Sequence, residues 1–308
     1  MSKKKIFITG GNGFLGRHLV PILKKKNLVV FPSSKELDLM NFNQLKNVTI
    51  NFDEIYHLAT WTQAGDFCLY NQGTQWINNQ IINSNIIKWW STYQKKAKLI
   101  FIGSSCCYSE LGNFKEENFI HDIPHPSLET YAMTKQILAQ GARACGYQFN
   151  LKWLGLVPPT LYGTNYHTDN RQSHFIFDLV KKILRGKFYN EKVILWGNGK
   201  QKREIMHVKD FVKNILLVNN KINNKIINIG STKDYSIKEF AKIISKIIEY
   251  DHKKITYDLS KYVGVNKKKL NIQKIKKIIP GYEKKLTDIN LGLNQVIKWY
   301  LKTDNYNA

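Results

Sequence analysis

The sequence predicts a doubly wound α/β fold, in which a parallel β-sheet is covered by helices on both faces. In residues 1–165, short apolar runs alternate with longer stretches of helical periodicity. The short runs lack the polar alternation of half-exposed strands, as expected for parallel strands buried on both faces. We predict strands at 4–10, 28–33, 54–59, 98–104 and 151–158.

Helices are expected between these strands, near 15–26, 41–47, 75–95 and 130–146. Right-handed crossovers then place ligands at the carboxyl ends of the strands.

The second half of the chain has a different pattern of polar and apolar residues. After about residue 163 a polar loop leads into helix-like and short strand-like segments, and 225–231 resembles one more core strand. We therefore expect the first domain to span 1–165, completed by about 207–231. Residues 166–206 and 232–308 form a smaller C-terminal α/β domain for the substrate.

Composition is that of an ordinary soluble protein, with 43% hydrophobic and 23% charged residues among 308. The N-terminus lacks the apolar run of a signal peptide, which predicts a cytoplasmic protein. The net charge of +24 attracts anions, yet the lysines are spread along the chain. We find no nucleic-acid module and no membrane span, so the charge does not decide the function.

The four cysteines contain no C-x-x-C pair, which argues against a metal site and predicts free thiols in a reducing compartment. They are Cys68, Cys106, Cys107 and Cys145.

The stretch TGGNGFLG (9–16) follows a predicted strand and opens a predicted helix. Gly10, Gly13 and Gly16 permit a tight turn and the close approach of a pyrophosphate. In this context the motif predicts a Rossmann dinucleotide-binding domain.

The second strand ends without the acidic residue that usually holds the ribose of NAD. Ser33 and Lys35 stand there instead, and Arg17 follows the glycines. These groups suit a 2′-phosphate and predict NADP(H), although Glu36 leaves NAD open.

Tyr131 and Lys135 form a Y-x-x-x-K pair, which a helix places on one face. A nearby ammonium favours the phenolate, so we expect the pKa of Tyr131 to be lowered toward neutral. In the stretch GSSCCYS (103–109), Ser104 follows the fourth strand and can bond the same substrate carbonyl as Tyr131. Nucleophilic serine chemistry is disfavoured because GSS lacks the second glycine of G-x-S-x-G.

These motifs resemble the extended short-chain dehydrogenase/reductases. Finer matches resemble the GDP-L-fucose synthases, which are GDP-4-keto-6-deoxymannose 3,5-epimerase/4-reductases. They are GSSC, NSNII (83–87), PPTLYG (158–163), SHFI (173–176), WGNGKQKREIMHVKD (196–210) and the tail from LNIQK onward. Some relatives in capsule pathways instead reduce GDP-linked 4-keto-6-deoxy-heptoses without epimerising them.

The resemblance implies NADPH-dependent reduction of the C4 ketone of a GDP-4-keto-6-deoxy sugar for surface polysaccharide, by a homodimer. It implies a reductase triad of Ser104, Tyr131 and Lys135, and an acid/base pair of Cys106 and His174 for epimerisation at C3 and C5. An extended backbone would point Cys106 and Ser104 into one pocket. Cofactor contacts are expected at Gly10, Gly13, Phe14, Leu15, Gly16, Ser33, Lys35, Lys135 and Pro158, and substrate contacts at Trp196 and Arg203.

Other interpretations stay open at this point. Cys106 and His174 can be ordinary packed residues, Arg203 a surface arginine, and Cys107 has a packing role by default. The segment 59–76 departs from the fucose synthases, so the sugar can differ. Rival functions are a nucleotide-sugar 4-epimerase or dehydratase with retained NAD, an inactive dinucleotide-binding regulator, and an anion-binding surface protein.

Overall fold

Six parallel strands form the central sheet of the computed structural model, which describes residues 3–169, 171–261, 263–304 and 306. The strand order is β10-β5-β4-β3-β1-β2, and every neighbouring pair is parallel. The predicted doubly wound α/β fold is confirmed. The strands are β1 (Lys5–Thr9), β2 (Leu28–Val30), β3 (Glu54–His57), β4 (Lys98–Ile102), β5 (Trp153–Val157) and β10 (Lys225–Asn228).

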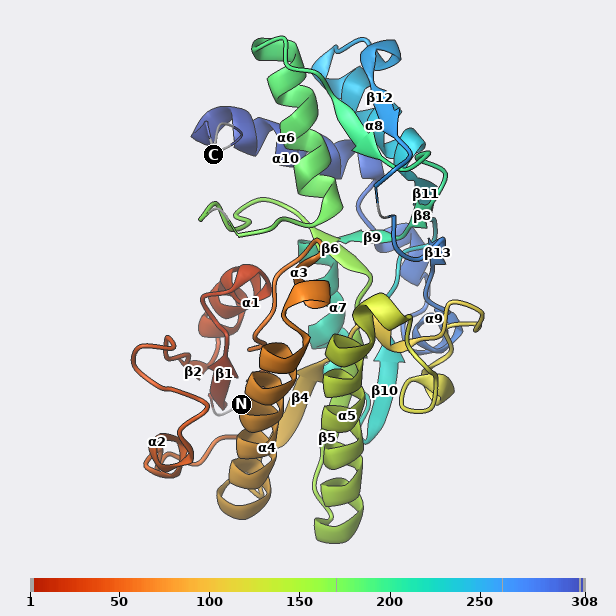
Figure 1. Cartoon of the computed structure of the whole chain (residues 1–308). Helices are drawn as coiled ribbons and strands as arrows, with labels where there is room; N and C mark the ends of the chain where they lie inside the picture. The colour runs from red at the N-terminus through yellow and green to blue at the C-terminus, as the bar shows by residue number, and fades with distance from the viewer. Residues whose placement is uncertain (1–2, 170, 262, 305, 307–308) are drawn as a thin grey trace.

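Helices cover both faces of this sheet, as Figure 1 shows. The two faces have separate apolar cores, because successive side chains of a strand point to opposite sides. One face is covered by α2 (Phe42–Lys46), α4 (Gln72–Tyr93) and α5 (Glu129–Phe149). The other is covered by α1 (Phe14–Lys24), α7 (Val208–Asn219) and α9 (Gln273–Ile278).

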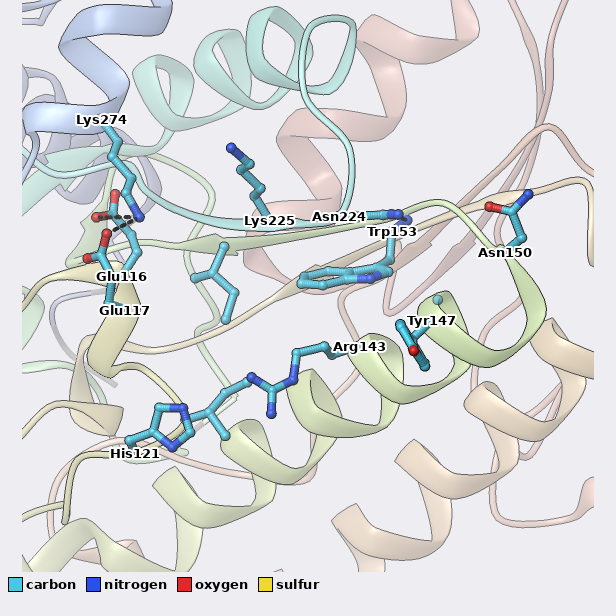
Figure 2. A pocket seen from close by; sticks show the side chains of 13 residues that line it. Glu116, Glu117, His121, Arg143, Tyr147, Asn150, Trp153, Asn224, Lys225 and Lys274 are labelled. Atoms are coloured by element: carbon cyan, nitrogen blue, oxygen red, sulfur yellow. Dashed lines mark hydrogen bonds and ion pairs between the residues drawn. The ribbon is translucent and has the colours of Figure 1, made fainter.

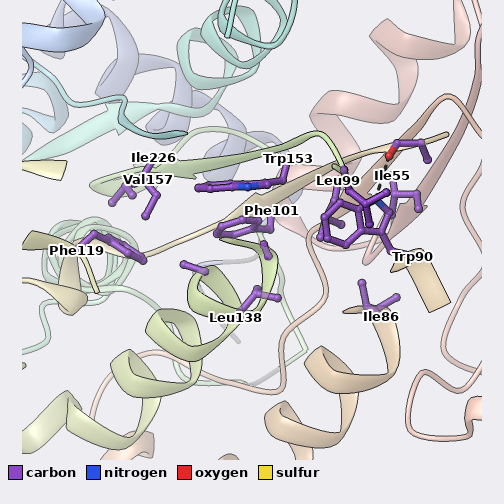
Figure 3. Close-up of a cluster of buried hydrophobic side chains, with 14 of the residues drawn as sticks. Ile55, Ile86, Trp90, Leu99, Phe101, Phe119, Leu138, Trp153, Val157 and Ile226 are labelled. Atoms are coloured by element: carbon purple, nitrogen blue, oxygen red, sulfur yellow. Dashed lines mark hydrogen bonds between the residues drawn. The ribbon is translucent and has the colours of Figure 1, made fainter. Parts of the chain in front are cut away.

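The core under α4 and α5 is built on aromatic side chains (Figure 3). Phe101 stacks on Trp153 with ring centres 6.1 Å apart. This stacking requires a glycine beside it, since a Cβ on Gly155 would lie 2.7 Å from the Phe101 ring. Each such buried side chain contributes roughly 1.5–3 kcal/mol by leaving water. The stacking joins the carboxyl end of β4, near Phe101, to the amino end of β5, where Trp153 lies.

The C-terminal part stands at the carboxyl edge of the sheet, in the upper half of Figure 1. Its helices α6 (Phe175–Phe188), α8 (Ile237–Ile248) and α10 (Ile289–Thr303) share a third apolar core. Three small sheets accompany them: β6 (Thr160–Tyr162) with β9 (Ile205–His207), β7 (Ile194–Trp196) with β12 (Thr256–Asp258), and β11 (Tyr235–Ser236), β8 (Lys202–Arg203) and β13 (Lys267–Lys268) in that order.

Short helical segments complete the chain. They are α3 (Phe67–Tyr70) and the 3₁₀ turns Ser105–Cys107, Glu116–Asn118, Pro126–Leu128, His252–Lys254 and Tyr282–Lys285. The division into domains at 165, 207 and 231 stays a prediction. In the described part of the chain, no helix has both the length and the apolar character of a membrane span.

Candidate active site

The glycine-rich turn between β1 and α1 is closed too tightly for side chains. Gly10 has φ +68°, and a Cβ there would lie 2.8 Å from a backbone nitrogen of the segment after β3. A Cβ on Gly16 would lie 2.3 Å from a carbonyl oxygen of the turn. The Gly13 N–H closes the turn by donating to the carbonyl oxygen of Gly10 at 3.0 Å. The first turn of α1 contains no acidic residue, and the N-terminus of a helix attracts anions, so this start fits a pyrophosphate. The residues at this start are Gly13, Phe14 and Leu15.

The end of β2 presents both basic and acidic groups. The backbone N–H of Ser33 donates to Glu36 Oε2 at 2.7 Å, and this bond lowers the pKa of Glu36. Lys35 is exposed, and Arg17 donates to the carbonyl oxygen of Asn12 at 2.9 Å. Arg17 also donates to the carbonyl oxygen of Asn165 at 3.3 Å. The contact of Arg17 and Lys35 with a 2′-phosphate stays a prediction.

Three predicted catalytic side chains meet beyond the carboxyl end of β4. Tyr131 and Lys135 lie one turn apart on α5, with Lys135 Nζ 5.9 Å from the centre of the tyrosine ring. Burial raises the pKa of Tyr131 well above its usual value, and a hydrogen bond with the Ser104 side chain opposes this shift. The expected lowering of the Tyr131 pKa is therefore wrong, because burial of the phenol disfavours its charged form more than the Ser104 hydrogen bond favours it.

Lys135 is a buried cation, with 4% of its surface exposed. Burial lowers its pKa to about 8. Among the residues that the structure describes, Nζ has neither a hydrogen-bond nor an ion-pair partner. An unpartnered ammonium in this position fits the predicted contact with a cofactor ribose. Pro158, another predicted cofactor contact, is buried directly after β5 at the same edge.

Cys106 lies in a 3₁₀ turn, so the expected extended backbone after Ser104 is wrong. Ser104 caps this turn, and its Oγ accepts a hydrogen bond from the Cys106 N–H at 3.2 Å. The half-buried Cys106 thiol nevertheless faces a polar partner, since Lys268 Nζ lies 3.3 Å from Sγ. Cys107 is fully buried and donates to the carbonyl oxygen of Ala132, which agrees with its predicted packing role.

His174 directly precedes α6, and its N–H donates to Tyr166 Oη at 3.3 Å. The side chain has exposed surface, yet the surrounding protein lowers its pKa to about 4, with further contributions from His167 and Lys268. His174 is therefore a neutral imidazole at neutral pH. Lys268 lies within electrostatic range of both predicted epimerisation groups.

The two predicted substrate contacts lie on different small sheets. Arg203 stands on β8 opposite Lys268 on β13. Its guanidinium donates to the carbonyl oxygens of Val263 at 3.0 Å and Val265 at 2.5 Å. The guanidinium N–H groups of Arg203 thus point to backbone carbonyls, and a diphosphate would have to compete with these carbonyls. Trp196, at the end of β7, is 44% exposed, and among the described residues it has no hydrogen bond or ring contact with Ser104, Tyr131 or Lys135.

Sequence reasoning missed Lys268 and the partner of the segment 60–68. Lys268 stands within three consecutive lysines, which look like a solvated charge run; its pairing with Cys106 is a long-range contact. Gln172 donates to Asp66 Oδ1 at 2.6 Å and accepts from the Phe67 N–H at 3.1 Å. These bonds join the segment 60–68, which lies in the stretch that differs from the fucose synthases, to the residues just before His174.

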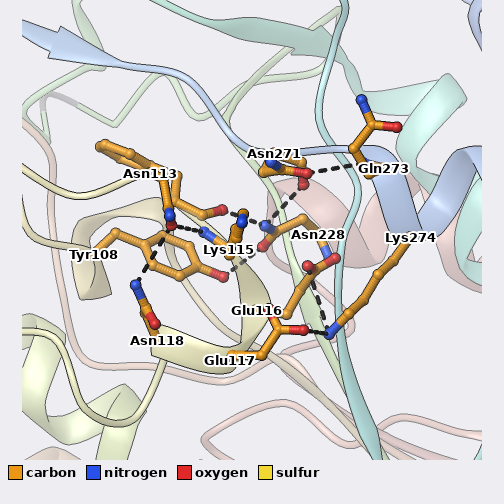
Figure 4. A network of polar contacts seen from close by, with 11 residues as sticks. Tyr108, Asn113, Lys115, Glu116, Glu117, Asn118, Asn228, Asn271, Gln273 and Lys274 are labelled. Carbon is orange, nitrogen blue, oxygen red and sulfur yellow. Dashed lines mark hydrogen bonds and ion pairs between the residues drawn. The ribbon is translucent and has the colours of Figure 1, made fainter.

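The loop from Cys107 to α5 is held by a polar network around Asn228 (Figure 4). Tyr108 Oη donates to Asn228 Oδ1 at 2.6 Å, and the Asn228 N–H donates to Glu116 Oε1 at 3.1 Å. Lys274 pairs with Glu117 at 2.7 Å. The network fixes the loop that joins Ser104 to Tyr131.

A cavity of about 520 Å³ lies away from these catalytic groups (Figure 2). It is lined at the amino ends of β5 and β10, by Trp153 and Lys225 among others, whereas Ser104 follows the carboxyl end of β4. The cavity is therefore not the site of the predicted chemistry. Within the described ranges, no group of three or more His, Cys, Asp or Glu residues could hold a metal ion.

The chain is similar to known proteins along nearly its whole length. The model of the NAD dependent epimerase/dehydratase family matches residues 6–230. GDP-L-fucose synthase of Escherichia coli is 27% identical, over 99% of this chain and 99% of that protein.

Two solved structures share the fold over nearly the whole chain. A GDP-L-fucose synthetase from Naegleria fowleri bound to NADP has a TM-score of 0.84 at 22% identity, covering 99% of this chain and 96% of the other. A GDP-6-OMe-4-keto-L-xylo-heptose reductase from C. jejuni has a TM-score of 0.85 at 23% identity, covering 98% and 99%.

Proposed function

This chain belongs to the NAD dependent epimerase/dehydratase family, and on that premise we propose that it reduces the C4 ketone of a GDP-linked 4-keto-6-deoxy sugar with NADPH. The observation that carries the proposal is the meeting of Ser104, Tyr131 and Lys135 at the carboxyl edge of the sheet, behind a glycine turn fit for a dinucleotide. Similarity to a GDP-L-fucose synthase along the whole chain supports the substrate class.

Tyr131 is the proton donor in this proposal. Because burial raises its pKa, it is a neutral phenol at neutral pH and carries the proton that the reduced C4 oxygen needs. The Ser104 hydroxyl orients the ketone toward it. Bound NADPH would supply the hydride.

Lys135 would hold the cofactor ribose, and it stabilises the tyrosinate that remains after proton transfer. Its burial strengthens that interaction, because charges attract more strongly where water is excluded. Arg17 and Lys35 would hold the 2′-phosphate of NADPH.

The pair Cys106 and His174 would exchange protons at C3 and C5, which the C4 ketone acidifies. One group removes a proton and the other returns one to the opposite face. Neutral His174 can accept a proton, and Lys268 holds the Cys106 sulfur in place at 3.3 Å. Arg203 would leave its carbonyl partners and bind the diphosphate.

Incubation with GDP-4-keto-6-deoxymannose and NADPH in D₂O tests both halves of the proposal. We expect NADPH oxidation, together with deuterium at C3 or C5. Oxidation without deuterium would remove the epimerase half. Absence of oxidation with every GDP-4-keto hexose and heptose would refute the reductase. Bound NAD(H) that survives purification, without net NADPH consumption, would favour the 4-epimerase or dehydratase interpretation.

We also propose a homodimer formed through α4 and α5, which lie side by side in Figure 1. Ile77 and Ile81 of α4 and Met133, Ile137 and Tyr147 of α5 are exposed, Tyr147 at 94%. Such apolar faces mark interaction surfaces. Light scattering should give twice the chain mass, and Ile137→Glu should give a monomer.

For a matched comparison, Leu291→Glu changes an exposed leucine of α10, and this variant should stay dimeric.

The cellular role of the reaction is also part of the proposal: it is a cytoplasmic step in GDP-deoxysugar synthesis for surface polysaccharide.

A further inference from the structure

Four buried polar residues form an unbroken chain of hydrogen bonds beneath the catalytic helix. His57 Nδ1 lies 2.8 Å from Thr9 Oγ1, and His57 Nε2 lies 3.1 Å from Asn83 Oδ1. Asn83 Nδ2 donates to the carbonyl oxygen of Thr134 at 3.2 Å. None of the four has more than 5% of its surface exposed. The predicted mechanism uses none of them.

The donor and the acceptor of each hydrogen bond can be assigned by starting from Asn83. Because Asn83 uses its amide N–H₂ toward Thr134, its oxygen faces His57 and can only accept. His57 Nε2 therefore carries the hydrogen, and in a neutral imidazole Nδ1 is then the acceptor. Thr9 must donate its hydroxyl hydrogen to Nδ1, while its oxygen accepts from the Ala59 N–H at 3.2 Å.

A neutral imidazole is thus the form of His57 in which both of its hydrogen bonds join a donor to an acceptor. A second proton on His57 would place an N–H where an acceptor is needed. Burial lowers the pKa of His57 to about 4, and the charge of Lys135 acts in the same direction. His57 is accordingly neutral at neutral pH and adds no second positive charge near Lys135.

The two ends of this series of hydrogen bonds lie at the two halves of the proposed reaction site, which are the cofactor turn and the start of α5. Thr9 is the last residue of β1, directly before the glycine turn. Thr134 directly precedes Lys135, and its hydroxyl donates to the carbonyl oxygen of Tyr131 at 2.7 Å. His57 ends β3 and Asn83 belongs to α4, so the bonds link β1, β3, α4 and α5.

We propose that His57 is a positioning residue for the reduction: it holds the cofactor turn and the start of α5 at a fixed separation. This rests on the proposed function of Tyr131 and Lys135. Hydride and proton transfer require reacting atoms to be held closely, and small displacements cost large factors in rate. Apolar side chains of similar volume could fill this space, but they would not specify the distance between the two ends.

Replacement of His57 by leucine and by glutamine tests the link. Leucine removes both bonds of the imidazole, whereas glutamine can keep an N–H donor toward Asn83. The control is Ile215→Ala, which opens the core on the opposite face of the sheet and accounts for general loss of stability. Measurements are amide hydrogen exchange of residues 129–135 without substrate, NADPH affinity, and kcat and KM for NADPH oxidation.

We expect His57→Leu to speed amide exchange at the start of α5 and to lower kcat about tenfold below the control at equal Tm, with KM changed less than threefold. His57→Gln should recover most of both losses. Equal effects of His57→Leu and Ile215→Ala on exchange and kcat, or no recovery with glutamine, would overturn the proposal.

Failure of the proposed function would look different. The wild-type protein would then leave NADPH unoxidised with every GDP-4-keto sugar. Amide exchange in α5 would still decide whether His57 holds the helix, since that measurement needs no substrate.

Discussion

Replacing Lys135 by methionine should stabilise the protein while abolishing its activity. A pKa lowered from the usual 10.5 to about 8 corresponds to roughly 3 kcal/mol that opposes the charged form in the folded protein. No hydrogen bond or ion pair of Nζ among the described residues offsets this cost, and its only ring contact is the Tyr131 ring, 5.9 Å away. Methionine fills a similar space without charge, so the free energy of unfolding at pH 7 should rise by up to roughly 3 kcal/mol.

The gain should depend on pH in a defined direction. Below pH 8 the wild-type ammonium is charged in the folded and the unfolded protein, and its cost is present in full. Between pH 8 and 10.5 the folded protein loses the proton first, so the wild type gains stability as pH rises. The advantage of methionine should disappear at the upper end of this range. Urea unfolding at pH 7 and pH 10 measures both values.

Lys98 provides the matched comparison, because burial lowers its pKa to about 8 as well. Its Nζ, however, donates to the carbonyl oxygens of Asn219 and Ile222, each at 2.6 Å. Lys98→Met leaves these carbonyls without a donor and should be less stable than Lys135→Met by about 1–3 kcal/mol. A Lys135→Met protein that unfolds at lower urea than the wild type at pH 7, or a gain equal at pH 7 and pH 10, would refute the reasoning.

Three further predictions concern the reaction. Tyr131→Phe should lower kcat for NADPH oxidation by about 10²–10⁴-fold with little change in NADPH affinity, and a variant of full activity would exclude Tyr131 as the acid. Lys268→Met should slow deuterium exchange at C3 and C5, measured by mass spectrometry, more than it slows reduction; equal losses would mean that the contact with Cys106 serves substrate binding alone. Gln172→Glu should repel Asp66 and expose 171–174 to faster amide exchange, while Asp66→Asn combined with Gln172→Glu restores protection. Failure of that exchanged pair to restore it would show that the contact does not hold the segment.

Several features of the site could be predicted because their signals are local. A glycine turn between a strand and a helix needs no distant partner to be recognised, and Gly10 and Gly16 indeed leave no room for a Cβ. Tyr131 and Lys135 are neighbours through helix geometry alone. The predicted roles of these residues stay predictions, although their meeting with Ser104 is observed.

Other features depended on contacts between residues far apart in the chain. Lys268 meets Cys106 only because β13 pairs with β8, and the lysine run around it carries no sign of this. Arg203 was predicted to contact a diphosphate, and nothing in the sequence indicated that its guanidinium donates to backbone carbonyls some 60 residues away, at Val263 and Val265. The direction of the Tyr131 pKa shift likewise depended on how deeply the folded chain buries the phenol.

The chain's own pattern of apolar runs, glycines and helical spacing was enough to assign the fold class and the core of the site, since each of these signals reflects backbone geometry within a few residues. Burial and long-range hydrogen bonds are properties of the packed molecule. They decided the charge state of His57 and His174, the partners of Arg203 and Cys106, and the turn that replaces the extended backbone after Ser104. Electrostatic energies depend on the local exclusion of water, which no stretch of sequence specifies alone.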